Sequence, residues 1–271
     1  MNSKFILRGS LFALIVVAVI LIITWFFLPQ ILLRLSNGVP IGPTPLPPII
    51  LASRGEMPAG PGGLEEWTQY RGEAYNLSGS GFLLQLSNGE VVGVTTAHSV
   101  SIGDPNRPLE RIAFKVAGQK EVAAEFETLH GKPGQPRTGT DMTVDYVLLK
   151  VDIPVDSSLV LTPDSRGVPQ VGERVSMFSG LGDGNGGRRI LQGTVLSVDT
   201  TAVWVLMDEW FDPGRMSGSP LISRHTGQVV GTAIAVSPRG GRLTIGFHPI
   251  GSIVRLAEAA DEFPAMADYR R

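Results

Sequence analysis

Three residue types that together catalyse acyl transfer occur in this chain in the order histidine, aspartate, serine. His98 ends an apolar stretch, Asp145 precedes another, and Ser217 lies in a turn rich in glycine and bounded by proline. A serine hydroxyl is a weak nucleophile and needs a base within hydrogen-bond reach, which a histidine provides near neutral pH. A buried carboxylate then fixes the tautomer of the imidazole and stabilises its protonated form. The sequence therefore predicts catalysis by Ser217, with His98 as base and Asp145 as its partner.

Each of these residues has an ordinary structural explanation when it is taken alone. A histidine at a strand end, an aspartate before an apolar run and a serine in a turn are common features of folded proteins. Asp141 also competes with Asp145, and Ser219 with Ser217. We favour Asp145 because the apolar run 146–149 would bury the strand that it begins. The combination and its order carry the prediction.

The segments around these residues resemble those of chymotrypsin-like serine proteases. The base lies in Thr96–Ser99 (Thr-Ala-His-Ser), the carboxylate in Asp145–Lys150 (Asp-Tyr-Val-Leu-Leu-Lys) and the serine in Ser217–Leu221 (Ser-Gly-Ser-Pro-Leu). Gly79–Phe82 resembles the Gly-Ser-Gly-Phe that opens the first barrel in many bacterial members, and Gly227–Gly231 resembles the hairpin that leads into the substrate-binding strand. The chain order matches this family and not subtilisins or α/β-hydrolases. The resemblance also favours Ser217 over Ser219, because Gly218 and Pro220 then fall where the family has them.

The resemblance covers roughly residues 78–256 and implies two six-stranded antiparallel β-barrels with the triad in the cleft between them. It implies hydrolysis of a polypeptide substrate through an acyl-enzyme, with no metal and no cofactor. The N–H groups of Arg215 and Ser217 are the implied oxyanion hole. The implied lining of the substrate pocket is Phe211, Asp212, Ile234 and Ala235.

Three positions depart from the family pattern. Arg215 stands where glycine is common, and a positive φ there strains a non-glycine residue. Met216 replaces the aspartate that pairs with a freed N-terminus in digestive members, so that activation switch should be absent. Ile234 replaces a serine that supports the buried aspartate. The first departure leaves a second hypothesis open, in which a catalytically silent barrel binds peptides or partner proteins at the membrane.

The primary specificity is not fixed by the sequence. The loop Asp208–Pro213 contains acidic and aromatic residues, so a basic or an apolar side chain could be accepted. His248 either faces the pocket, where it would favour acidic side chains, or simply ends a strand, and we favour the second interpretation.

Short apolar runs separated by turn residues follow Gly79, a pattern typical of an all-β barrel or sandwich. Asn88-Gly89, between the runs 81–86 and 90–95, indicates a hairpin. A helical apolar period occurs in 250–260. The remaining predicted strands are 111–116, 122–129, 146–151, 174–178, 190–198, 202–207, 220–222, 229–235 and 243–247.

The composition excludes several classes of function. The chain has no cysteine, which rules out thiolate catalysis, disulfides and cysteine-bound zinc. Its formal net charge of -2 provides no basic field for nucleic acid. The 33 glycines and 20 prolines suit a fold with many turns.

An apolar segment, Leu11–Leu28, is interrupted only by Thr24. At about 1.5 Å per residue it would extend about 27 Å, close to the hydrocarbon thickness of a bilayer. Lys4 and Arg8 precede it, which places the N-terminus in the cytoplasm and the rest of the chain outside. A cleaved signal peptide is the alternative, but its apolar region is usually shorter and ends in a small-x-small site. We expect a single-pass, uncleaved anchor in the cell membrane.

These patterns divide the chain into four expected parts. Residues 1–34 form the cytoplasmic tip and transmembrane signal-anchor, and residues 35–63 form a spacer rich in proline and glycine. Residues 64–262 form the protease-like domain, and residues 263–271 form a C-terminal tail. Within the spacer, the apolar run 49–51 could instead pack on the domain.

Overall fold

The computed structural model describes residues 47–48, 51–185, 187–239 and 241–270. Within these residues the chain is built of β-strands, with one α-helix, α2 (Ile250–Glu258), and two short 3₁₀ turns, η1 (Ser157–Leu159) and η2 (Met266–Asp268). The predictions of an all-β fold and of a short C-terminal helix are confirmed. The expected transmembrane segment lies outside the described residues, among which no helix is both long and apolar enough to cross a bilayer.

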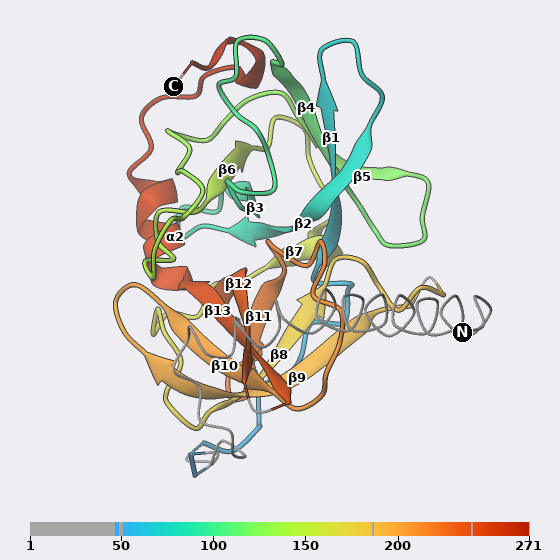
Figure 1. Cartoon of the computed structure of the whole chain (residues 1–271). Coiled ribbons are helices and arrows are strands. Elements are labelled where there is room, and N and C mark those ends of the chain that lie inside the picture. Colours follow the sequence, from blue (N-terminus) through green and yellow to red (C-terminus); the bar gives the residue numbers. More distant parts are fainter. Residues whose placement is uncertain (1–46, 49–50, 186, 240, 271) are drawn as a thin grey trace, which may run out of the picture. The chain divides into compact units, whose positions relative to one another are not determined.

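The N-terminal half of the described chain forms one sheet, drawn in the upper part of Figure 1. Its hydrogen-bonded order is β5-β4-β1-β2-β3-β6, and β7 pairs with β2 in parallel. The strands are β1 (Leu64–Tyr70), β2 (Asn76–Gln85), β3 (Val91–Thr95), β4 (Leu109–Lys115), β5 (Val122–Phe126), β6 (Val147–Lys150) and β7 (Val160–Leu161).

The expectation of a complete barrel in this half needs correction. The sheet is a half-barrel whose path ends at β5 and β6. A short bridge between Leu129 and Leu149 joins the two ends, supported by the hydrogen bond from His130 N–H to the carbonyl of Leu148. Beyond Gly131, whose φ is 80°, the contact continues without a regular strand: Gly134 N–H donates to Tyr146 O at 2.9 Å and Gln135 N–H donates to Val144 O at 2.7 Å.

The C-terminal half forms the closed six-stranded barrel that the family resemblance implied, in the order β10-β13-β12-β11-β8-β9. It occupies the lower part of Figure 1. Its strands are β8 (Arg174–Ser179), β9 (Arg189–Val198), β10 (Val203–Met207), β11 (Pro220–Ser223), β12 (Val229–Arg239) and β13 (Arg242–Pro249).

In the N-terminal sheet, the sequence pattern predicted one hairpin correctly and missed one strand. The predicted hairpin at Asn88-Gly89 is confirmed: β2 pairs with β3, and Gly89 has the φ of 86° that such turns require. The first strand, β1, was not predicted. Its inward-facing side chains alternate along the strand, but those of Glu66 and Thr68 are polar, which hides the apolar alternation that marks a half-buried strand.

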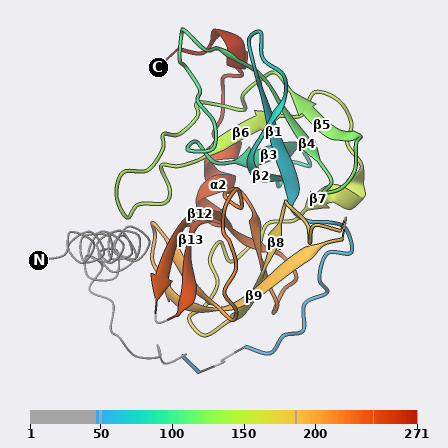
Figure 2. The same ribbon diagram turned by 45° about the vertical axis from the view of Figure 1, so that its right-hand side comes forward.

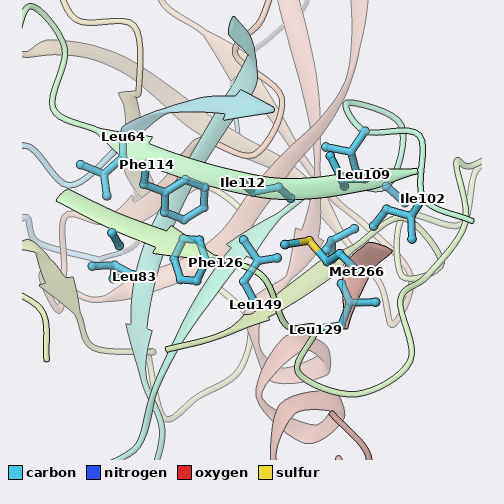
Figure 3. Close-up of a cluster of buried hydrophobic side chains, with 14 of the residues drawn as sticks. Leu64, Leu83, Ile102, Leu109, Ile112, Phe114, Phe126, Leu129, Leu149 and Met266 are labelled. Atoms are coloured by element: carbon cyan, nitrogen blue, oxygen red, sulfur yellow. The ribbon is translucent and has the colours of Figure 1, made fainter. Parts of the chain in front are cut away.

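Three large clusters of buried side chains hold the fold together, beside a small fourth one. The first fills the N-terminal sheet, where the rings of Phe114 and Phe126 meet edge to face with centroids 5.0 Å apart, and the second fills the C-terminal barrel. The third joins the sheet, the barrel and α2 through residues such as Phe82, Phe178 and Ile253. In Figures 1 and 2, α2 accordingly lies beside strands of both halves. Figure 3 labels members of the first cluster: Leu64, Leu83, Ile102, Leu109, Ile112, Phe114, Phe126, Leu129, Leu149 and Met266.

The end of the expected spacer is attached to the C-terminal barrel. The Arg188 guanidinium donates to the carbonyls of three successive residues, Pro58 to Gly60, at 2.9–3.0 Å. Gly55 N–H donates to Arg224 O at 3.0 Å, and the Ala52 carbonyl lies 3.0 Å from His225 Nδ1. The part of residues 35–63 that follows Ala52 is therefore structurally part of the folded domain.

Candidate active site

The turn that carries Ser217 is held against strand β2 of the other half of the fold. Ser80 N–H donates to the Ser217 carbonyl at 2.9 Å, and Ser80 Oγ donates to the Arg215 carbonyl at 3.0 Å. The approach is so close that a Cβ on Gly218 would lie 1.8 Å from the carbonyl oxygen of Ser80. Gly218 also has a φ of 91°, so glycine is required there on both counts.

His98 and Asp145 are positioned by a pair of neighbouring strands. β3 and β6 are antiparallel, with Thr95 opposite Val147. His98 follows the end of β3 and Asp145 precedes the start of β6, so the two residues leave the sheet at the same edge. The strand pairing therefore brings together residues that are 47 positions apart in sequence.

The three predicted side chains meet in one hydrogen-bonded line. His98 Nδ1 lies 2.9 Å from Asp145 Oδ2, and His98 Nε2 lies 2.7 Å from Ser217 Oγ. The carboxylate is fully buried, while the imidazole side chain is 32% exposed. A shielded acid, a base and a hydroxyl open to solvent are thus arranged as nucleophilic catalysis requires.

Asp145 is kept ionised by hydrogen bonds from the surrounding backbone and from the imidazole. Burial opposes ionisation, but the bonds from His98 and Arg137 outweigh it and hold the pKa of this carboxyl below its usual value. The amide of His98 donates to one oxygen and the amide of Arg137 to the other, both at 3.1 Å. Ile234, which replaces the supporting serine of the family, makes no hydrogen bond with its side chain. The Arg137 amide is a support that the sequence does not reveal.

Arg215 adopts the positive φ that strains a non-glycine residue. Its φ is 61°, and no other non-glycine residue in the described chain has a positive φ. Met216 N–H donates to Pro213 O at 3.1 Å, which closes a turn whose third residue is Arg215. Gly214 does not have a positive φ, so the turn is of type II, whose third position normally holds glycine or asparagine.

The type II turn fixes the direction of the Arg215 N–H. A type I turn would close with the same hydrogen bond and without positive φ, but its central peptide, between Gly214 and Arg215, would be reversed. In the observed turn, neither Arg215 N–H nor Ser217 N–H donates to another group of the described residues. Both donors therefore remain available beside the Ser217 hydroxyl.

A small apolar cavity of about 60 Å³ lies beside Ser217. Ile234 and Ala235 line it. Phe211 and Asp212 do not: Phe211 is buried in the barrel core, and Asp212 points back to accept a hydrogen bond from Gly214 N–H at 2.9 Å. The remaining walls, which the sequence did not identify, are Met177, Pro213, Met216, Ala233, Val236 and Ile245.

The competing residues lie apart from this arrangement. Asp141 Oδ1 accepts hydrogen bonds from the amide and hydroxyl of Thr143, and the buried Ser219 hydroxyl has no partner among the described residues. His248 is fully buried, stacks edge to face on Tyr146 and does not line the cavity. Burial lowers the pKa of His248 to about 4. The described residues contain no cluster of histidines and carboxylates arranged to hold a metal ion.

Comparisons with known proteins match this chain to a peptidase family and to solved structures of similar fold. A family model described as trypsin-like peptidase domain matches residues 79–231. Comparison with curated protein sequences gives no match. Similar solved structures include a serine endoprotease from Yersinia pestis (19% identity, TM-score 0.48, covering 74% of this chain and 65% of that one). The HtrA-type protease AlgW with a tripeptide (18%, 0.46, 73% and 59%) and kallikrein-related peptidase 10 (18%, 0.50, 74% and 94%) are also similar.

The matched region thus spans less than two thirds of the first two of these structures. At these identities, the likeness concerns the fold.

Replacing Arg215 by glycine should stabilise the protein. A non-glycine residue at positive φ costs about 1 kcal/mol or more, so Arg215→Gly should raise the free energy of unfolding by about 1 kcal/mol. Arg215→Ala is the matched control, because it removes the charge and the long side chain but keeps the strain. It should not reproduce the gain. Urea denaturation of both variants measures the difference, and a loss of stability in Arg215→Gly would contradict the conformation described above.

Proposed function

This chain belongs to the trypsin-like peptidase domain family, whose model covers more than half of it, and from that premise we propose that it is a serine endopeptidase. Ser217 is the nucleophile, His98 the general base and Asp145 the carboxylate that orients it. The observation that carries the proposal is the continuous line of hydrogen bonds from the buried carboxylate through the imidazole to the serine hydroxyl.

The first half of the proposed reaction forms an acyl-enzyme. As Ser217 Oγ attacks the carbonyl carbon of the scissile peptide bond, its proton passes to His98 Nε2, 2.7 Å away. Asp145 stays ionised and stabilises the imidazolium. The free N–H groups of Arg215 and Ser217 are available to bind the negative oxygen of the tetrahedral intermediate. His98 then gives the proton to the leaving amine, and the C–N bond breaks.

The second half releases the product. A water molecule attacks the acyl carbon while His98 takes its proton, and the tetrahedral intermediate forms again. Its collapse returns the proton to Ser217 Oγ and frees the carboxylic acid. The cycle uses no group beyond the chain, its substrate and water.

A catalytically silent, peptide-binding barrel is the second candidate, and the strain at Arg215 favours it. Reversal of the central peptide in that turn would relieve the strain and turn one oxyanion donor away. Loss of one such donor typically costs about 10²–10³-fold in kcat. The two candidates differ in whether the chain hydrolyses peptides at all.

Substitution of the three central residues tests the catalytic assignment. Ser217→Ala and His98→Ala should each remove nearly all hydrolysis of a peptide library, because these residues act as a unit. Asp145→Asn should lower kcat about 10⁴-fold by favouring the wrong tautomer of the imidazole. Rates are measured on the purified full chain.

Two neighbouring residues serve as controls. Ser219→Ala and Asp141→Asn should cost far less activity, because neither side chain contacts His98 in the structure. If Ser219→Ala abolished hydrolysis while Ser217→Ala spared it, the assignment would be wrong. If the unsubstituted chain bound peptides without cleaving them, the silent barrel would be the correct interpretation.

The cavity beside Ser217 supports a preference for small apolar side chains. In chymotrypsin-like enzymes this pocket selects the residue before the cleaved bond: an acid at its base selects basic side chains, and a reduced pocket selects small ones. Here Val236 and Ile245 restrict the volume, and none of the lining residues carries a charge. The nearby Asp208 is occupied by an ion pair with Arg174. We therefore expect alanine or valine at this position.

Peptides that differ at this one residue measure the preference. Alanine and valine substrates should exceed lysine, glutamate and phenylalanine substrates by at least about tenfold in kcat/KM, since a misfit or an unpaired buried charge costs more than about 1.4 kcal/mol. Val236→Ala should shift the preference toward larger apolar residues without admitting lysine. A native preference for lysine or glutamate would show that another pocket is used.

We also propose that the chain is a single-pass membrane protein whose protease domain lies on the extracytoplasmic side. The support is the apolar segment Leu11–Leu28 with the basic residues that precede it. Because the segment after Ala52 is attached to the domain, only the part of the spacer before Ala52 would separate the domain from the bilayer.

Fractionation of cells tests the anchor. The full chain should remain in membranes after alkaline carbonate extraction, and added protease should reach its folded domain only from the extracytoplasmic side. A variant without residues 1–34 should be released by the same extraction. Release of the full chain, or a shorter chain matching cleavage after the apolar segment, would show that the segment is not an anchor.

A further inference from the structure

A second buried carboxylate contacts the residue that follows His98 and has no part in the reaction described above. Glu66, in the middle of β1, is fully buried. Among the described residues it has no cation as a hydrogen-bond partner; the groups within hydrogen-bond distance of its oxygens are the hydroxyls of Ser78, Thr95 and Ser99. A buried acid without a salt bridge is costly, because burial disfavours the charged form.

One branch of these hydrogen bonds leads to the catalytic base. Ser99 follows His98 directly, and its hydroxyl lies 3.1 Å from Glu66 Oε2. The same hydroxyl bonds to the carbonyl and the hydroxyl of Thr96, at 2.9 and 3.0 Å. Thr96 and Ser99 enclose His98 in the sequence, so this branch fixes the backbone from which the imidazole extends.

The other branch leads to the nucleophile turn. Thr95 Oγ1 bonds to Glu66 and lies 2.9 Å from the Ser80 carbonyl. Ser80 in turn holds the carbonyls of Arg215 and Ser217 through its hydroxyl and its amide. Glu66 thus lies where the supports of the base and of the nucleophile converge.

We propose that Glu66 is a positioning residue that holds the His98 segment in place and favours the protonated form of His98. The proposal rests on the serine protease function proposed above, in which that protonated form appears twice in each cycle. Asp145 provides a negative charge at Nδ1, and Glu66, which contacts the neighbouring Ser99, adds a second.

The charged groups near Glu66 and His98 indicate that the negative charge of Glu66 acts mainly on His98. Opposite Glu66 stand Gly79 on β2 and Phe114 on β4, neither of which ionises, and the charged group that acts on its pKa is His98. Within the described part of the chain, Asp145 is in direct contact with His98, and the charge of His98 acts on Glu66. Beyond Asp145 lies His248, on which Asp141 also acts; burial lowers the pKa of His248 to about 4, so it is uncharged at neutral pH.

Glu66 also carries a cost in stability that a purely structural residue would not have. Burial raises its pKa to about 6, against the opposing hydrogen bonds from the three hydroxyls. The folded state therefore binds a proton at Glu66 more readily than the unfolded chain does. By linkage, the contribution of Glu66 to stability is lost as the pH rises through about 6. At pH 8, removing its charge should leave the protein as stable as before or more stable.

Nuclear magnetic resonance of the histidine side chains tests the proposal without requiring activity. The full chain carrying Ser217→Ala is titrated with and without Glu66→Gln, and the His98 signals are assigned by their loss in His98→Ala. Glu66→Gln should lower the midpoint of the His98 titration by about half a pH unit, as expected for the loss of one nearby charge. In the chain with Ser217 intact, Glu66→Gln should lower kcat about threefold with little change in KM.

Glu173 provides the matched control. It is an equally buried acid, but it lies in the other half of the fold and pairs with Arg166. Glu173→Gln should lower the melting temperature and leave the His98 titration unchanged. Glu66→Gln should lower the midpoint of the His98 titration and, at pH 8, leave the melting temperature unchanged or raise it. Ser99→Ala, which keeps the charge of Glu66 but removes its link to the His98 segment, should lower kcat without moving the midpoint.

The outcomes separate the two proposals. An unmoved His98 midpoint in Glu66→Gln, with a lowered melting temperature, would show that Glu66 is only structural. If Glu66→Gln does not fold, the wild-type curve decides: coupling to Glu66 broadens the His98 titration beyond that of a single proton, and a one-proton curve overturns the proposal. Absence of hydrolysis by the unsubstituted chain would count against the protease function and leave the titration result intact.

Discussion

The contact between Ser80 and the Ser217–Gly218 backbone is the constraint on which the candidate site depends. The base and its carboxylate come from the N-terminal sheet, and the nucleophile comes from the C-terminal barrel, so the distance from His98 to Ser217 depends on how the two halves meet. Two hydrogen bonds from Ser80 and the absence of a side chain at Gly218 set that meeting point. The third hydrophobic cluster and α2 hold the halves together around it.

Within that frame, the electrostatic arrangement is made of two buried carboxylates and one exposed imidazole. Asp145 is kept ionised by amides and by His98, whereas Glu66 is surrounded by hydroxyls and is easier to protonate than an ordinary glutamate. A hydroxyl can donate to an ionised acid or accept from a protonated one, which makes it a suitable partner for a group that titrates near neutral pH. The strained Arg215 is connected to the same hydrogen-bonded groups, because Ser80, which lies next to Thr95, donates to its carbonyl.

Sequence reasoning identified the three side chains that the structure brings together, but it did not identify most of the residues that line the cavity beside them. His98, Asp145 and Ser217 could be predicted because acyl transfer demands those residue types, and the strands could be predicted from short apolar runs between turn residues. The strand β1 was missed because Glu66 and Thr68 interrupt its apolar face. The Arg137 amide could not be foreseen, because a backbone group carries no sequence signal.

Other errors arose where tertiary packing decides the outcome. Phe211 was expected in the pocket, but an aromatic ring of that size lies in the barrel core, and Asp212 turns back on its own loop. The N-terminal half-barrel does not close as a full ladder, because the segment after β5 meets the β6 segment through an isolated bridge and a few further hydrogen bonds. Strand length and loop direction of this kind depend on contacts that no local pattern records.

The central claim is that Ser217 is an activated nucleophile, and the reaction of the folded chain with a fluorophosphonate probe tests it most directly. Mass spectrometry should find one probe group per chain, attached to Ser217, and denaturing the protein first should abolish the labelling. Labelling of a different serine, or no labelling of the folded chain at all, would contradict the account.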